Sequence, residues 1–481
     1  MKRTIPAVGM TAALLASLLF SGCSFPGGTA SSQAPATQET AAPSAEPTPA
    51  AEPVPNPLTG VADADYTNRR PVAVTLRTLE GAAPQWGLSS ADVLVEGVSE
   101  GTTASLMALY SSVDNISKAG PVGPGRDLLL QMALPLNALP VHIDKNIYAS
   151  NLLNTLTYQD LDGYHIGKAA FAFDQDRQNA GYREENCWYT TGELIQNGLN
   201  TYGTSLEGAN TPLFVFGERP AVEESARNAT ALTIAFSPDD SEQLNYAADT
   251  GLYVKTNADG SPTVDADNGQ QVAFTNVLVL YASSGIKDDG YTRDYDLTGG
   301  TGLYLTGGAW EQIQWTKEDA TGPLQLTAAD GSPLVVSPGK SFIAIWGGYY
   351  GQSLTLTGAD GTAQTLPEKP ALLESGVSDE AAAAAQAEFD AKQKIIDAQA
   401  AVDEANAQLT DAQTALEEAQ AALEEDSENA DLIAKRDEAQ ALVDSLNQTI
   451  ADNQAILDAA GVSATPTPAP EEATSSSESG E

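Results

Sequence analysis

The spacing of apolar and polar residues changes along the chain, and each pattern predicts a different kind of structure. In the first long patterned region, runs rich in β-branched residues predict strands, whereas runs with helical spacing predict helices. The strands are expected at residues 71–76 and 91–98, and the helices at 126–136 and 146–156. Pro135 is awkward within the first of these helices. The mixture predicts a layered α+β domain, which we assign to residues 56–225.

The next region has the pattern of a β domain. Short strand-like runs alternate with turn clusters rich in Gly, Asn and Asp, at 251–255, 272–281, 302–305 and 341–346. Regular spacing of strands and turns favours a mostly antiparallel β domain over residues 226–348. The residues that follow are punctuated by Gly and Pro and predict one more hairpin and a linker, which we assign to 349–377.

Residues 379–460 contain neither Pro nor Gly, and their apolar side chains recur at alternate steps of three and four. This heptad pattern forms two series, separated by a plausible turn at 425–429. Folding the second series back on the first sets Ala398 opposite Leu457 and Ala405 opposite Ile450, so that large residues meet small ones. We therefore predict an antiparallel coiled-coil hairpin over 378–460, with paired arms of ~29 residues or ~43 Å.

A parallel dimer is the alternative for this segment. It would set alanine against alanine along much of the seam, which makes a poor core, and it would leave the second helix without a role. The hairpin also carries 20 Asp and Glu against 4 Lys and Arg, a net charge of −16. Such an excess of acids is explained either by a solvated face or by docking onto a basic partner. The last segment, 461–481, is expected to be a disordered acidic tail.

The N-terminus has the three-part pattern of an export signal. Lys2 and Arg3 precede an uncharged apolar run at 7–20, which is too short to span a bilayer. Two small residues then precede Cys23, as in bacterial lipoprotein signals, in which the cysteine sulfur receives a diacylglycerol. Phe20 departs from the leucine usual at its position, and an ordinary signal peptide is the alternative. We predict a signal peptide over 1–22 and lipidation at Cys23.

Residues 23–55 consist almost entirely of Ala, Pro, Ser, Thr and Glu. Such a segment cannot bury enough apolar surface to offset its ordering entropy, so it predicts a disordered tether. A tether is useful only when one end is fixed, which supports the lipid anchor independently. The predicted location is the extracytoplasmic face of the cell membrane, with the lipid bilayer as a partner through acylated Cys23.

Charge and cysteine content exclude some classes of function. The formal net charge of −42 argues against nucleic acid as a partner, because phosphate binding depends on Lys and Arg. It also argues against electrostatic adhesion to anionic lipid. With Cys23 acylated, Cys187 is the one remaining thiol, so no intrachain disulfide can form.

Short motifs in both predicted domains resemble those of the YerB-type family of bacterial lipoproteins. In the first domain they are 56–60 (NPLTG), 68–74 (NRRPVAV), 87–93 (GLSSADV), Glu100-Gly101, 120–122 with Arg126, and Val141-His142. In the second they are Asp265 with 276–279 (NVLV), and the stretch from Gly308 through 315–317 (WTK) to Pro338-Gly339. The resemblance covers about residues 56–346. It implies a membrane-anchored lipoprotein with an α+β domain followed by a β domain, and no established biochemical activity.

The chain departs from the family pattern at several polar positions. Ser105 and Gly123 stand where the resemblance implies arginines, and Thr263 stands where it implies a histidine. The run 184–189 (EENCWY) also differs from the family motif. These changes put any inherited polar site in doubt.

The candidate ligand-binding residues lie in the polar motifs of the first domain: Glu96, Glu100, Arg126, His142, Asp176 and Arg177. Glu96 and Glu100 have even spacing and would share one face of a strand. His142 and Asp144 could likewise lie on one face, and His165 or Glu100 could complete a metal site. Isolated hydrogen-bonded histidines explain the pattern better, so we predict neither a metal nor a cofactor.

Other sequence features have simpler explanations than catalysis. Cys187, between Asn186 and Trp188, is expected to be packed rather than nucleophilic. Residues 265–269 (DADNG) favour a hairpin turn over a calcium loop. Residues 120–125 (GPVGPG) lack the Lys-Ser/Thr of a phosphate-binding loop.

The sequence therefore favours a binding or scaffold lipoprotein at the cell envelope, on whose helical hairpin envelope proteins dock. The alternative is an envelope hydrolase or transferase that uses a polar site around His142, Glu100 and Arg126.

Overall fold

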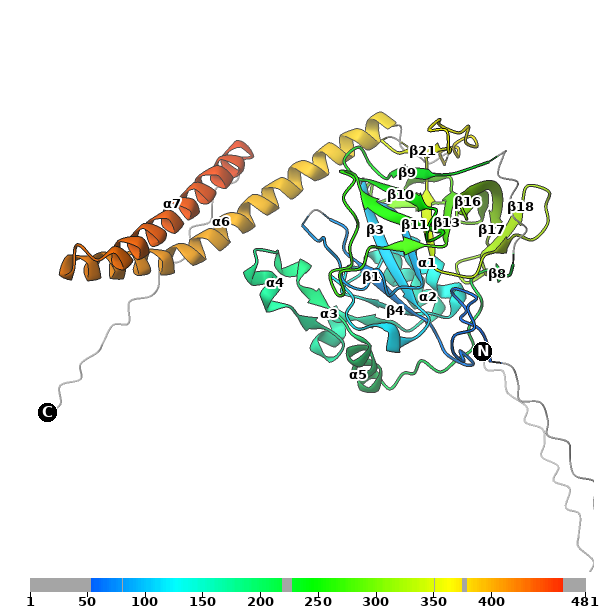
Figure 1. Ribbon diagram of the computed structural model, residues 1–481, viewed down its shortest axis with the longest axis horizontal. Helices are drawn as coiled ribbons and strands as arrows, with labels where there is room; N and C mark the ends of the chain where they lie inside the picture. The colour runs from blue at the N-terminus through cyan, green and yellow to red at the C-terminus, as the bar shows by residue number, and fades with distance from the viewer. Residues whose placement is uncertain (1–52, 80, 219–226, 350, 374–378, 462–481) are drawn as a thin grey trace, which may run out of the picture. The chain divides into compact units, whose positions relative to one another are not determined.

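The computed structural model describes residues 53–79, 81–218, 227–349, 351–373 and 379–461 (Figure 1). Cys23, the predicted signal peptide, and nearly all of the predicted tether and tail lie outside the described residues. Within the described ranges, no helix is both long and apolar enough to cross a membrane.

The first predicted domain contains both strands and helices, as expected. Its strands are β1 (Val72–Leu76), β2 (Val93–Glu100), β3 (Thr103–Tyr110), β4 (Leu139–His142), β5 (Leu161–Asp162), β6 (Ala172–Phe173), β7 (Trp188–Tyr189) and β8 (Val215–Phe216). Its α-helices are α1 (Asp127–Ala133), α2 (Ile147–Leu156), α3 (Gly163–Ile166), α4 (Gln175–Asn179) and α5 (Gly192–Tyr202).

Side-chain caps fix where several of these helices begin. The Asn146 side chain accepts a hydrogen bond from the Ala149 amide at the start of α2, and Thr191 does the same for Leu194 in α5. The helix predicted at 126–136 is shorter than expected. It ends at Ala133, and a 3₁₀ turn containing Pro135 follows (Leu134–Leu136), because proline cannot donate to an α-helical ladder.

The second predicted domain is built from strands, as expected. They are β9 (Ala231–Ala235), β10 (Ser241–Ala247), β11 (Leu252–Asn257), β12 (Ala273–Phe274), β13 (Asn276–Tyr281), β14 (Ser284–Ile286), β15 (Arg293–Tyr295), β16 (Gly299–Thr306), β17 (Ala309–Thr316), β18 (Gln325–Ala328), β19 (Val335–Val336), β20 (Ser341–Trp346) and β21 (Ser353–Thr357). The last of these lies within the segment expected to hold a hairpin and a linker, and it pairs with β9.

One ten-stranded mixed sheet runs through both predicted domains. Its order is β18-β17-β16-β13-β20-β2-β3-β1-β4-β5, so strands of the second region occupy one half and strands of the first region the other. The two halves meet where β20 lies parallel to both β13 and β2. All six residues of β20 are buried, as expected for a central strand covered on both faces.

The two faces of this sheet pack against different layers. One face meets the five-stranded sheet β12-β11-β10-β9-β21, and the core between them includes Leu94, Leu232 and Phe342. The other face packs against α1, with Val95, Leu129 and Ile343 in a second core. The result is an α+β body in which residues far apart in sequence share both cores.

The C-terminal segment forms the predicted helical hairpin. Helix α6 (Asp379–Glu425) and helix α7 (Ala430–Ala459) are joined by a short turn and pack against each other (Figure 1). Asn429 caps α7 by accepting hydrogen bonds from the amides of Asp431 and Leu432. Ala398 and Leu457 share one cluster, and Ala405 packs with Ile450 in another, as the predicted pairing requires. The two seams are thus paired within one chain.

Candidate functional site

Glu100 and Arg126 form the central pair of the candidate site. Glu100 ends β2, and Arg126 has extended backbone at the residue before α1. Arg126 Nη2 donates a hydrogen bond of 2.8 Å to Glu100 Oε2, and its Nε lies 2.8 Å from Oε1. Both side chains are largely buried, at 17% and 14% exposed. One hydrogen bond and the close ion pair hold the guanidinium against Glu100, although Nε itself makes no hydrogen bond.

A pocket of about 110 Å³ opens beside this pair. Its walls are the end of β1 with the loop that follows, the start of β3, Pro124 and Tyr291. Ser105, one of the two positions where the resemblance implies an arginine, lines it. At Gly123, the other, an added Cβ would lie 3.1 Å from the carbonyl of Leu76 and 3.2 Å from the amide nitrogen of Arg77. The site thus lies where this chain departs from the family pattern.

Arg77 lines this pocket and also a neighbouring one beside Glu184 and Glu185. Its Nε is buried without a hydrogen-bond partner, and its guanidinium forms no hydrogen bond or ion pair with the described residues. Burial lowers the pKa of Arg77, and the charge of Arg126 lowers it further, while Glu185 acts in the opposite direction. Arg77 is therefore a partly desolvated cation beside a second arginine.

The prediction that Glu96 and Glu100 share one face of a strand is wrong. A β-bulge between Val98 and Glu100 shifts the register of β2 against β3, which interrupts the alternation of side chains. Glu96 is only 2% exposed and lies with Glu242 of β10 and Lys255 of β11. The two carboxylates thus have separate partners.

The group around Glu96 is a buried charge cluster between the two large sheets. Lys255 forms an ion pair with Glu242, and one oxygen of Glu96 and one of Glu242 have no hydrogen-bond partner. Burial raises the pKa of Glu96 well above its usual range, and the charge of Glu242 raises it further. Burial and Glu242 also raise the pKa of Asp240 to about 6. The cluster holds one lysine among three carboxyl groups.

His142 is fully buried at the end of β4, and its partner is not the one expected. Asp144 follows the strand with a positive φ of 67°, so the strand alternation that would have placed it beside His142 does not apply. Instead, His142 Nε2 lies 2.9 Å from Oδ2 of Asp160, just before β5. The other ring nitrogen has no partner, and the ring packs against Gly125, where an added Cβ would lie 2.7 Å from Nδ1. This close packing explains the glycine that precedes Arg126.

His142, Asp160 and Asp162 have ligand atoms within 4.8 Å of one another, close enough to hold a metal ion. The Lys145 ammonium, however, lies 2.9 Å from Asp160 and 2.7 Å from Asp162. Burial raises the pKa of Asp160, but hydrogen bonds from His142 and Lys145 outweigh this effect and lower that pKa to about 2. A lysine therefore supplies the positive charge that a metal would bring. His165, considered above as a ligand, is mostly exposed.

Asp176 and Arg177 contribute to a different part of the body. Asp176 is exposed on α4. Arg177 is buried, donates to the carbonyl oxygens of Ala82 and Pro84, and stacks on the rings of Trp86 and Tyr182 at 4.3 and 4.1 Å. Both Nη groups and both faces of the guanidinium are occupied, while Nε has no hydrogen-bond partner, so the role of Arg177 is to hold the loop before β2.

Two simpler predictions are confirmed by the structure. Cys187 is fully buried, and burial raises the pKa of its thiol, the opposite of what a nucleophile requires. Residues 265–269 form a turn, in which the Gly269 amide donates to the Asp265 carbonyl. The Asp265 carboxylate accepts hydrogen bonds from the amides of Gly87 and Ser89, which ties the second region to the first.

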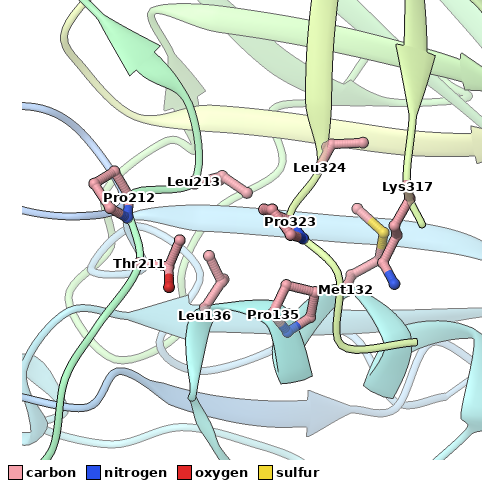
Figure 2. A pocket seen from close by; sticks show the side chains of 9 residues that line it. All are labelled: Met132, Pro135, Leu136, Thr211, Pro212, Leu213, Lys317, Pro323 and Leu324. Atoms are coloured by element: carbon pink, nitrogen blue, oxygen red, sulfur yellow. The ribbon is translucent and has the colours of Figure 1, made fainter. Parts of the chain in front are cut away.

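Lys317 belongs to a motif of the resemblance and lines a second, apolar pocket (Figure 2). Burial lowers its pKa to about 8, and its ammonium donates to the Asp319 carbonyl. The free volume is about 10 Å³, room for no more than one water molecule. We interpret this pocket as a packing contact between the chain after β17 and the turn after α1.

Sequence reasoning missed the residues that complete these clusters. Arg77 was not considered because it follows a strand without a recognisable motif. Lys145, Asp160 and Asp162 surround His142, and the Asp-Leu-Asp spacing at 160–162 was the one available signal. Glu242 and Lys255 come from the other sheet, so no local pattern connects them with Glu96.

Two family models match the chain. The "Protein of unknown function (DUF3048) N-terminal domain" matches residues 58–205, and the "Protein of unknown function (DUF3048) C-terminal domain" matches residues 232–343. The chain belongs to this family. The N-terminal match contains Arg77, Glu100 and Arg126, and the helical hairpin lies beyond both matches.

A curated relative and a solved structure agree with this assignment. The chain is 28% identical over 305 residues to the "Putative lipoprotein YerB" of Bacillus subtilis (strain 168), which covers 60% of this chain and 85% of the relative. The crystal structure of YerB protein from Bacillus subtilis is similar with a TM-score of 0.55 and 25% identity. That likeness covers 63% of this chain and 99% of the other. The resemblance found in the sequence motifs is confirmed, and the family has no established biochemical activity.

Proposed function

We propose that this protein is a lipid-anchored binding and scaffold protein on the extracytoplasmic face of the cell membrane. In this proposal acylated Cys23 fixes the chain to the bilayer. The α6–α7 hairpin is the arm on which envelope proteins dock.

The observation that carries this proposal is how the hairpin uses its apolar residues. Ala398, Ala405, Val443 and Leu457 are each buried and pack in the seam between the two helices. The outer faces carry exposed acids, among them Glu417 and other residues whose side chains are open to solvent. Because the apolar seam is already filled, the exposed face offers polar and acidic groups, which suit a reversible contact with a basic protein surface.

The anchor is supported by two independent features. Residues 1–23 have the pattern of a lipoprotein signal, and the relative from Bacillus subtilis is named as a lipoprotein. The hairpin lies outside the residues matched to the family, so it is an addition to a two-part body of the YerB type. Anchor, body and arm together fit a scaffold.

The geometry gives less support to the enzyme alternative. His142 has no exposed surface, and its Nε2 is held by Asp160, so it cannot reach a substrate without rearrangement. Glu100 is held at two points by Arg126. His142→Ala and Glu100→Ala would leave the cellular function of a folded scaffold unchanged, whereas an enzyme would lose it.

The scaffold proposal can be tested by crosslinking on intact cells followed by identification of partners. Three versions would be compared: the full chain, a chain lacking residues 378–460, and a chain whose hairpin is partly neutralised by changing Glu417, Glu418, Glu424 and Glu425 to Gln. We expect a partner that is captured by the full chain, absent with the deletion and reduced with the neutralised hairpin. Equal capture by all three at equal membrane abundance would refute the role of the arm.

A further inference from the structure

The pocket beside Glu100 and Arg126 is lined by a cation, Arg77, that forms no ion pair with the part of the chain that the structure describes. Arg77 has a buried Nε, and its guanidinium forms no hydrogen bond or ion pair with the described residues. The Nε–H donor is buried, and leaving a buried donor without an acceptor costs free energy. An acceptor from outside the chain would recover that cost.

Two of the neighbouring carboxylates are engaged with other arginines. Glu100 is held at two points by Arg126, at 2.8 Å each. Glu185, which lines the adjoining pocket, forms its ion pair with Arg183 at 2.9 Å. Glu185 attracts Arg77 only at longer range and on the half-exposed side, where solvent screens it. Asp144 also attracts Arg77 and Glu184 lines the adjoining pocket, but both are exposed, and no described carboxylate forms an ion pair with Arg77.

The other lining groups describe the rest of a ligand. Leu76, Leu79 and Pro124 provide apolar walls. The Ser105 hydroxyl is hydrogen-bonded to Ser99 at 2.6 Å, and the Thr78 hydroxyl donates to the Ala104 carbonyl, so neither competes for Arg77. The pocket volume of about 110 Å³ suits a small molecule. The planar guanidinium of Arg77, beside apolar walls, is complementary to an oxyanion that carries a short carbon skeleton.

We propose that this pocket binds the carboxylate or phosphate group of a small anionic ligand, with Arg77 as the residue that contacts the oxyanion. The Arg126–Glu100 pair forms one wall of the pocket. The site is independent of the hairpin and of the scaffold role proposed above, because every residue in it belongs to the α+β body.

The proposal can be tested by calorimetric titration of the purified full chain with two probes, succinate and inorganic phosphate. We expect at least one of them to bind with a Kd of about 1 mM or tighter. Arg77→Gln should weaken that binding at least about tenfold, because the charged fork is lost. Arg77→Lys should retain phosphate binding better than succinate binding, since lysine acts as a point charge.

The control is Arg69→Gln, which removes an arginine whose side chain is half-exposed and lies outside this pocket. It should leave binding of both probes within about twofold of the original protein. Thermal unfolding of each variant establishes whether it is folded. If Arg77→Gln does not fold, the Arg77→Lys variant alone tests the role of Arg77. Failure of both probes to bind the original chain, or equal binding by the Arg77 variants, would overturn the proposal.

Discussion

At the scale of single residues, unpaired charge distinguishes the polar groups that hold the fold from those that can serve a ligand. The two Nη groups of Arg177 and the carboxylate of Asp265 form hydrogen bonds within the protein. The guanidinium of Arg77 forms no hydrogen bond or ion pair with the described residues, and for this reason we expect Arg77 to contact a ligand. Glu96 is a third case, because it is buried with too few cations nearby.

Glu96 leads to a prediction about pH. Its pKa is raised in the folded state by burial and by Glu242. The folded chain therefore binds this proton more tightly than the unfolded chain, and stability falls as pH rises from the unfolded pKa toward the folded one. Glu96→Gln removes this loss. We expect the variant and the original protein to have a similar free energy of unfolding at pH 4. At pH 8 we expect the free energy of unfolding of the variant to be higher by on the order of 1 kcal/mol, measured by denaturant unfolding.

The charged groups that face Glu96 are Glu242, Lys255 and Asp240, and they are present in both versions of the protein. Glu318→Gln, at an exposed position, is the matched control and should stay within about 0.5 kcal/mol at both pH values. A variant that is less stable than the original at pH 8 would contradict the assignment of Glu96 as a buried, destabilising acid.

The same scale shows how far the sequence predicts a site. Glu100 and Arg126 were both proposed from their motifs, and the structure brings them into contact. Glu96 was misplaced because a bulge cannot be read from the spacing of residues. The partners of His142 were missed because they come from the next strand of a parallel pair, and pairing between strands is not a local property.

At the scale of elements, the C-terminal helices were the best predicted part of the molecule. Their heptad spacing gave the two seams, the turn near residue 427 and the opposition of small and large residues. A coiled coil follows from one repeated pattern and needs no information from the rest of the chain. Strand β20 is the opposite case, because its run of apolar residues predicts a buried strand but not its two neighbours.

The hairpin provides a prediction with a control in the same helix. Leu457 has no exposed surface and packs with Ala398 and Val402, whereas Leu442 is 49% exposed. Leu457→Ala should destabilise the hairpin by about 2–4 kcal/mol, because it leaves a cavity in the seam. Leu442→Ala should change its stability by less than about 0.5 kcal/mol.

Hydrogen exchange of residues 379–459 in the full chain measures this difference. The account expects faster exchange across both helices for Leu457→Ala and unchanged exchange for Leu442→Ala. Equal effects of the two substitutions would show that the seam assigned here does not hold the helices together.

At the scale of the whole molecule, the two family regions are joined more closely than their separate sequence patterns suggest. They contribute five strands each to one sheet, with β20 beside β2 at the join. The composition of each region predicted its elements, but the join depends on strands about 250 residues apart in sequence, which no local pattern encodes. A scaffold benefits from such a body, because it keeps its two halves in one orientation.

The central claim is that this body is held at the membrane by a lipid on Cys23. The most direct test is mass spectrometry of the N-terminal peptide of the protein isolated from the membrane fraction of its native cells. The account predicts a mature chain that begins at Cys23 and carries the mass of a diacylglycerol on its sulfur. A mature chain that begins at another residue, or a Cys23 without an acyl group, would contradict it.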